Sequence, residues 1–234
     1  MRAALMSLLR DQAHRTPRRP VAEWGKEAPT YLEAYSLAGV LTRYFVDVAG
    51  LESDDAVLLS SPDSMGQFCA LAAIQACGAK ALIVPTEAPQ GVLGDLLARE
   101  SPRVALVADP VTCACVRDAL PDTLVFSMGA PEVDAPSMGY MADQAIGLVD
   151  EVYLKVEDYP FDETRDVCMA FVDFEGRCEE IRGSALAAEA EELASSRGLA
   201  DGAQVGISAS FSTRAGAVRL YAALSVGATI VLRG

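Results

Sequence analysis

Lysine, histidine and long apolar runs are scarce in this chain of 234 residues. Lysine accounts for only three of its 19 basic residues, and the single histidine is His14. His14 lies near a basic cluster in the first helical pattern and the chain has no Gly-x-Ser-x-Gly turn, so we expect no Ser-His-Asp catalytic triad. Gly-Lys-Ser/Thr and Gly-x-Gly-x-x-Gly are also missing, which excludes two common glycine-rich phosphate loops. No stretch approaches the ~18 uncharged apolar residues of a membrane span, so no membrane partner is expected.

Basic residues are outnumbered by acidic ones. There are 33 Asp and Glu against 19 Lys and Arg, which gives a net charge of −14. Such a surface repels polyanions, so we expect no nucleic-acid partner. Residues 150–166 hold seven of the acids without the spacing of a calcium loop, and we predict no metal site. Six cysteines do not make a disulfide scaffold in a chain this long, so buried reduced thiols and a cytoplasmic location are expected.

What is present is an alternation of short apolar runs with longer helical patterns, which is typical of parallel βαβ units. We predict strands at 57–60, 81–84, 104–107 and 123–126, separated by helices. An amphipathic helix with Leu5, Leu8 and Leu9 on one face opens the chain. Residues 1–127 are therefore expected to form a first α/β lobe. Residues 128–166, rich in Pro and Gly at first, are expected to be an irregular linker with one strand at 149–156.

Two segments of the chain repeat one another. The patterns of residues 50–84 and 198–232 both predict a Gly-Leu turn, a strand, a helix, a Gly-Ala turn and a second strand, in that order. Residues 167–234 are therefore expected to be a partial second α/β lobe related to the first. The fold class predicted is α/β, with mostly parallel sheets flanked by helices in two related lobes, the second truncated.

The stretch 14–85 resembles the opening of the adenylate-forming (AMP-binding) enzymes: acyl-CoA synthetases, adenylation domains and luciferases. The match includes a Thr-Tyr-x-Glu helix start at Thr30, and a Gly-Ala turn at Gly78 that leads to Pro85. The resemblance implies two stacked α/β lobes, then a small barrel and a mobile carboxy-terminal domain. This chain covers the first lobe and the start of the second, and it resembles short stand-alone bacterial halves of such ligases. The family's magnesium-binding acid, ribose-binding aspartate and adenylation lysine would lie beyond Gly234.

The segment that corresponds to the family's phosphate loop has a different chemistry here. The family loop is rich in Thr, Ser and Gly and ends in Pro-Lys-Gly, whereas residues 171–180 hold four acids, one glycine and no Ser, Thr or Lys. Each carboxylate about 4 Å from a phosphate would cost about 4 kcal/mol at an effective dielectric near 20. Glu175, Gly176 and Arg177 occupy this degenerate loop position. We predict a plain β-hairpin that is no phosphate loop.

A second family motif, an aromatic residue followed by a polar one, shapes the family's substrate pocket. Here Phe211 matches the aromatic residue and Ser212 replaces its polar partner. One interpretation is a residual pocket lined by Phe211, Ser212, Arg214 and Ser61. The other is a core phenylalanine beside a helix-capping serine. A ligand would lie at the carboxyl ends of the strands, near residues 60–62 and 208–211.

These features favour a non-catalytic binding or assembly module. It would need no cofactor, and a homodimer or heteromeric protein partner would cover open strand edges such as 229–232. The alternative is an AMP-forming acid–thiol ligase-like protein that still binds ATP with Mg²⁺, or an acyl-adenylate. In that case it would act alone or with a partner chain supplying the missing half. No catalytic residue is assigned.

Overall fold

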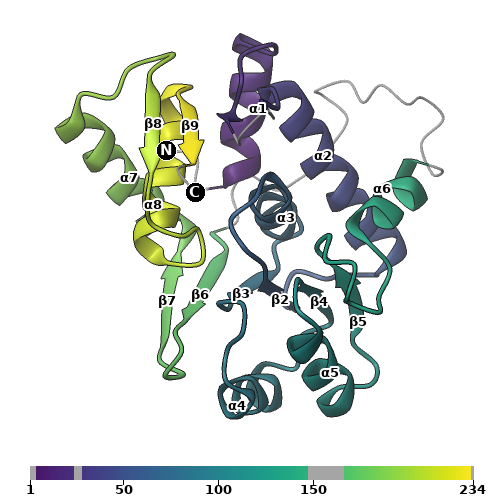
Figure 1. Cartoon of the computed structure of the whole chain (residues 1–234). Coiled ribbons are helices and arrows are strands. Elements are labelled where there is room, and N and C mark those ends of the chain that lie inside the picture. The colour runs from purple at the N-terminus through teal and green to yellow at the C-terminus, as the bar shows by residue number, and fades with distance from the viewer. Residues whose placement is uncertain (1–3, 24–27, 147–165, 233–234) are drawn as a thin grey trace.

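The computed structural model describes residues 4–23, 28–146 and 166–232, which form two sheets flanked by helices (Figure 1). The helices are α1 Leu5–Arg15, α2 Tyr31–Arg43 with a π-helical turn Tyr44–Val48, α3 Met65–Ala76, α4 Gln90–Glu100, α5 Pro110–Ala119, α6 Met138–Ile146, α7 Gly183–Arg197 and α8 Arg214–Val226. The strands are β1 Ala22–Glu23, β2 Ala56–Ser60, β3 Lys80–Ile83, β4 Val104–Val107, β5 Leu124–Ser127, β6 Cys168–Val172, β7 Cys178–Arg182, β8 Gln204–Ile207 and β9 Thr229–Leu232.

The larger sheet has the strand order β5-β4-β2-β3-β6-β7, and all neighbours are parallel except β6 and β7. Its central strands are buried on both faces, as their continuous apolar sequences predict. Val57 and Leu59 of β2 belong to the main core with α2 and α3, whereas Leu58 belongs to a second core with α4 and α5. The predicted α/β class, with mostly parallel sheets between helices, is confirmed.

The smaller sheet has the order β1-β9-β8 and is parallel throughout. We expected the strand at 229–232 to be an open edge, and this is wrong. β9 lies in the middle of its sheet, because Val21 and the short strand β1 pair with it from the other end of the chain. Among the described strands, the outer ones of this sheet are β8 and the two-residue β1.

The two repeated segments have the same local structure. In each, a strand, a helix and a parallel strand follow one another: β2-α3-β3 in the first and β8-α8-β9 in the second. Gly50 and Gly198 both have φ +60°, and Gly78 and Gly227 have φ +77° and +70°. Glycine tolerates this left-handed conformation at the ends of helices, which explains why the repeat keeps it there.

The observed sheets differ from the expected division of the chain at two places. Strands β6 and β7 extend the larger sheet, although 167–182 was expected in the second lobe, and β1 belongs to the smaller sheet. Within the expected irregular linker, α6 is a helix, which begins after Pro136 and buries Met141. The strand expected at 149–156 lies outside the described residues.

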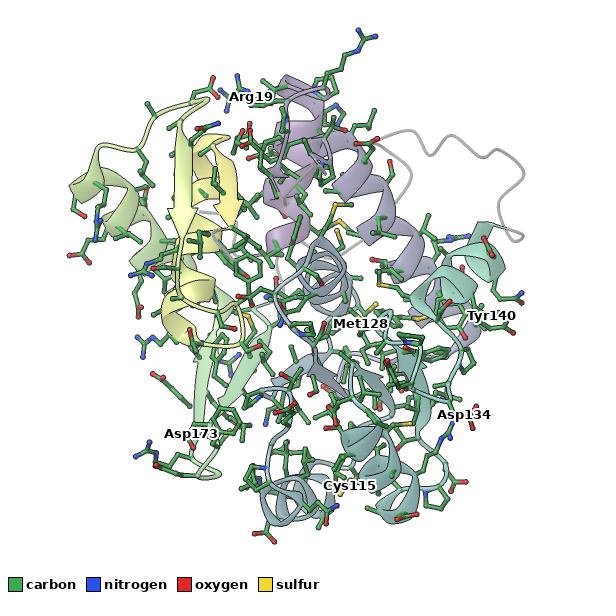
Figure 2. All side chains as sticks on the ribbon, in the orientation of Figure 1. Arg19, Cys115, Met128, Asp134, Tyr140 and Asp173 are labelled. Carbon is green, nitrogen blue, oxygen red and sulfur yellow. The ribbon has the colours of Figure 1, made fainter. Side chains whose placement is uncertain are left out.

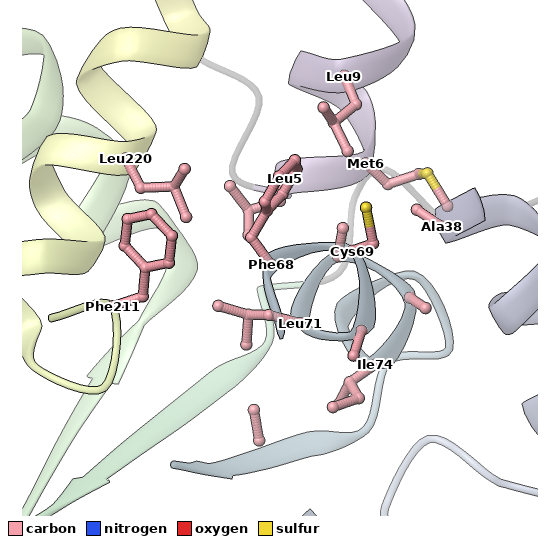
Figure 3. Packing of buried hydrophobic residues seen from close by; sticks show 14 of the residues in the cluster. Leu5, Met6, Leu9, Ala38, Phe68, Cys69, Leu71, Ile74, Phe211 and Leu220 are labelled. Carbon is pink, nitrogen blue, oxygen red and sulfur yellow. The ribbon is translucent and has the colours of Figure 1, made fainter. Parts of the chain in front are cut away.

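The core joins both sheets through side chains from distant parts of the chain. Figure 3 shows Leu5 of α1 and Phe68 of α3 facing Leu220 of α8 and Phe211, all buried. A buried polar contact adds to this: the Gln75 amide bonds the Tyr221 hydroxyl at 2.8 Å and accepts the Leu5 N–H at 3.0 Å. Since a buried polar group without a partner is costly, this network fixes α1, α3 and α8 against one another.

Candidate functional cleft

A cleft of about 600 Å³ opens where the carboxyl ends of β2 and β6 meet the start of α8. This is the edge at which open α/β sheets bind ligands, and the size suits a small organic molecule. The cleft has an apolar side and a hydroxyl-rich side. Its lining residues are Ser61, Pro62, Pro85, Thr86, Phe171, Val172, Asp173, Phe174, Arg177, Cys178, Glu179, Ser210, Ser212, Thr213 and Arg214.

The turn before α8 forms one wall and is tightly held. Asp63, at the start of the α3 segment, accepts hydrogen bonds from the Ser210 hydroxyl at 2.9 Å and from the Phe211 N–H at 2.8 Å. Thr213 caps α8 by accepting from the Gly216 N–H at 3.2 Å. The helix-capping role considered for Ser212 therefore belongs to Thr213, since the chain turns into the helix one residue later.

Gln67 joins the end of β2 to the turn before α8, and it was not predicted as a site residue from the sequence. Its amide nitrogen donates to the Ser61 carbonyl at 3.2 Å and to the Ser212 hydroxyl at 2.9 Å. The side chain is buried, and its Oε1 has no hydrogen-bond partner among the described residues. The available signal was a glutamine inside an otherwise apolar helix, where a polar side chain needs a partner.

The residues proposed for a residual pocket are only partly together. Ser61, Ser212 and Arg214 line the cleft, whereas Phe211 does not. Its ring is 1% exposed and points into the core beside Leu220 (Figure 3). Phe211 therefore supports the wall from behind and has no surface for a ligand.

Arg214 brings a positive charge to the cleft, but two carboxylates already bind it. Its guanidinium forms ion pairs with Glu189 of α7 and Glu179 of β7. The hydrogen bonds that Arg214 donates to Glu189 and Glu179 raise its pKa above the ordinary value. Because both partners compete with any anionic ligand, the guanidinium is a poor anion site.

The β6–β7 hairpin is the opposite wall, and its turn is closed by its own carboxylate. Asp173 Oδ1 accepts the N–H groups of Glu175 at 2.9 Å and Arg177 at 3.0 Å, and Oδ2 accepts from Arg177 Nε at 2.6 Å. These bonds, with that from the Arg177 side chain first, lower the pKa of Asp173. Gly176 permits the turn with φ +81°. The predicted plain hairpin is confirmed, and Figure 2 shows Asp173 near its tip.

The hairpin tip contributes to the cleft unevenly. Arg177 lines it, while Glu175 and Gly176 do not. Phe174, which the sequence analysis did not single out, lines it with 58% of its surface exposed. Among the residues that the structure describes, no group of three His, Cys, Asp or Glu side chains could hold a metal ion. In the same residues, no helix is long and apolar enough to cross a membrane.

No family model and no curated protein matches the sequence. Solved structures do match: VinN with L-aspartate superposes with a TM-score of 0.79 at 14% identity, over 97% of this chain and 61% of that one. The luciferase-like enzyme from the nonluminescent Zophobas morio mealworm gives 0.75 at 14% identity, over 98% and 54%. The chain has the fold of the adenylate-forming enzymes.

At these identities the likeness concerns the adenylate-forming fold and no more. The Klebsiella oxytoca NpsA N-terminal subdomain, in complex with 3-hydroxyanthranilyl-AMSN, also shares it, with a TM-score of 0.71 at 15% identity. The match covers 100% of this chain and 54% of that one. The chain thus spans less than two thirds of the length of each of these three structures.

Proposed function

We propose that this chain is a non-catalytic module of the adenylate-forming fold that binds a small, largely apolar molecule without a phosphate group in the cleft. The observation that supports this most is the hairpin turn. Its N–H groups at Glu175 and Arg177, which could otherwise bind a phosphate, donate to the Asp173 carboxylate. A ligand phosphate would have to displace a carboxylate that is held by three hydrogen bonds.

The charges around the cleft support the same function. Four carboxylates, those of Asp173, Glu175, Glu179 and Glu189, surround two guanidinium groups, and both guanidiniums are already in ion pairs. The local excess of two negative charges repels a triphosphate. The apolar side offers aromatic and aliphatic contacts instead, from Phe171, Val172, Phe174, Pro62 and Pro85. A neutral or cationic ring compound suits this environment, and no cofactor is needed to hold it.

A second candidate is binding of ATP or an acyl-adenylate, alone or beside a partner chain that supplies the rest of the fold. One observation favours it: the NpsA N-terminal subdomain has the same fold and is in complex with 3-hydroxyanthranilyl-AMSN. The two candidates differ in the charge of the ligand, so a series of phenyl compounds whose polar groups carry different charges separates them.

The test is a titration with benzylamine, benzamide, benzoate and phenyl phosphate, followed by calorimetry or NMR shifts. We expect benzylamine and benzamide to bind and phenyl phosphate not to bind. Cys178→Phe should abolish binding by filling the cleft, whereas Cys115→Phe, at another half-buried cysteine outside the cleft, should leave it intact. Tightest binding of phenyl phosphate, or binding that Cys178→Phe does not change, would contradict the proposed function.

A further inference from the structure

Gln67 of α3 is buried and does not line the cleft, but it fixes a hydroxyl group that does. Its amide nitrogen donates to the Ser61 carbonyl at 3.2 Å and to the Ser212 hydroxyl oxygen at 2.9 Å. A carbonyl can only accept, so turning the amide over would place two acceptor oxygens against each other. The orientation of the amide is therefore set, and in it the Ser212 oxygen is the acceptor.

The hydroxyl proton of Ser212 has no acceptor among the residues that the structure describes. The hydroxyl oxygen accepts from Gln67, and the backbone N–H of Ser212 donates to the Ser210 hydroxyl at 3.1 Å. These are the hydrogen bonds of Ser212 with described side chains, and in neither does its hydroxyl donate. Since a hydroxyl group has one proton to donate and Ser212 lines the cleft, this proton is available to a molecule bound there.

The other hydroxyl groups that line the cleft do not share this property. Ser210 donates to the Asp63 carboxylate at 2.9 Å, and Thr213 donates to the Ser210 carbonyl at 2.7 Å. Ser61 donates to the carbonyl of the following residue at 3.1 Å. Thr86 has no hydrogen bond to a described residue, so its hydroxyl can either donate to a ligand or accept from one.

The ionised groups of the cleft bond to one another in pairs. Asp173 accepts from Arg177 at 2.6 Å, and Glu179 accepts from Arg214. Each pair presents both a donor and an acceptor, so neither pair makes the cleft select a neutral ligand by its hydrogen-bonding group. The hydroxyl that Gln67 holds is the group that can make this selection.

We propose that Gln67 is a positioning residue: it makes the Ser212 hydroxyl a donor to the cleft, so that the ligand bound there carries a carbonyl group. The inference rests on the proposed function, because it concerns the molecule that this cleft binds. The carbonyl oxygen would accept the Ser212 proton while the apolar part of the ligand contacts Phe171 and Phe174. Neutral ketones, amides and esters have this chemistry. A hydrocarbon of the same shape would leave the proton without a partner, which costs binding free energy.

The test titrates the full chain with acetophenone and with ethylbenzene, which has a similar shape but a CH₂ group in place of the carbonyl. We expect Ser212→Ala to lower the affinity for acetophenone by about fivefold and to leave that for ethylbenzene unchanged. Comparing variants cancels the different hydration of the two ligands. Gln67→Leu should act in the same direction, because the Ser61 carbonyl, now without its donor, competes for the Ser212 proton. The matched control Thr86→Val, which removes the other available hydroxyl, should change neither affinity.

Infrared spectroscopy of bound acetophenone, labelled with ¹³C at the carbonyl, gives a readout that a loss of packing would not change. Hydrogen bonding lowers the carbonyl stretching frequency, so we expect a lower frequency in the wild-type cleft than in hexane, and a return towards the hexane value in Ser212→Ala and Gln67→Leu. A wild-type frequency equal to that in hexane, an affinity loss equal for both ligands, or an effect of Thr86→Val instead would overturn the inference and leave the proposed function standing. Failure of both ligands to bind the wild type would overturn both.

Discussion

At the residue scale, Gly216 of α8 has a backbone neighbour that leaves no room for a side chain. A Cβ atom there would lie 1.9 Å from the Ser210 carbonyl oxygen. Since that oxygen belongs to the turn that forms the cleft wall, neither the helix nor the turn can shift without a cost in free energy. We predict that Gly216→Ala lowers the free energy of unfolding by about 3 kcal/mol. Urea unfolding followed by circular dichroism measures it.

Gly94 of α4 is the matched control for this substitution. It is also helical, but a Cβ there meets nothing within 4 Å. Gly94→Ala should therefore stabilise the protein by about 0.5–1 kcal/mol, because alanine loses less backbone entropy on folding. Equal effects of the two substitutions would contradict the close approach at Gly216.

Buried groups that stay protonated in the folded state make the protein less stable at alkaline pH. Burial raises the pKa of the Cys77 thiol to about 12 and also raises the pKa values of Cys69 and Tyr221. In the unfolded chain these groups lose protons near pH 8.5 and 10. Raised folded pKa values mean that their stabilising contribution is complete below about pH 8 and decreases as the pH rises towards 12.

We therefore predict that the urea midpoint falls between pH 8 and pH 11, and that Cys77→Ala reduces this fall. Cys115→Ala, which removes another half-buried thiol, is the control for the loss of a cysteine side chain in general. A midpoint that stays constant over this range would contradict the burial of the three groups.

At the element scale, the start of α8 tests which residue caps the helix. Thr213 accepts the Gly216 N–H, whereas Ser212 bonds to Gln67. Thr213→Ala should cost about 1 kcal/mol of unfolding free energy, the usual loss for a helix cap. Ser212→Ala keeps the cap and is expected to cost less. A larger loss of unfolding free energy in Ser212→Ala than in Thr213→Ala would indicate that Ser212 caps the helix.

Elements whose signal is local could be predicted from the sequence, and those set by distant contacts could not. The strands β2, β3, β4 and β5 and the β6–β7 hairpin follow from apolar runs and turn residues in their own segments. The helix α6 was missed, since prolines and glycines surround it. Its start depends on Ser137, whose hydroxyl accepts the Tyr140 N–H at 3.2 Å, and on the burial of Met141. Gln67 was missed for a similar reason, because its partners Ser61 and Ser212 meet only in the fold.

At the scale of the whole molecule, pairing between the ends of the chain decides the arrangement of the sheets. Ala22 is the register partner of Ile230, and the Tyr31 hydroxyl donates to the Ala228 carbonyl at 2.6 Å. The repeat predicted two related βαβ units but not the pairing of β1 with β9, because a two-residue strand carries almost no sequence pattern of its own. This pairing gives β9 a neighbour on both sides and leaves β1 and β8 as the outer strands of the described sheet.

The central claim is that the carboxylate of Asp173 and its acidic neighbours close this version of the fold to ATP and to acyl-adenylates. The most direct test is a calorimetric titration of the full chain with ATP and Mg²⁺, and with an acyl-sulfamoyl adenosine. We predict no binding tighter than about 100 μM, equivalent to roughly −5.5 kcal/mol, for either ligand. Tighter binding of either one in the cleft, weakened by Cys178→Phe but not by Cys115→Phe, would contradict the claim.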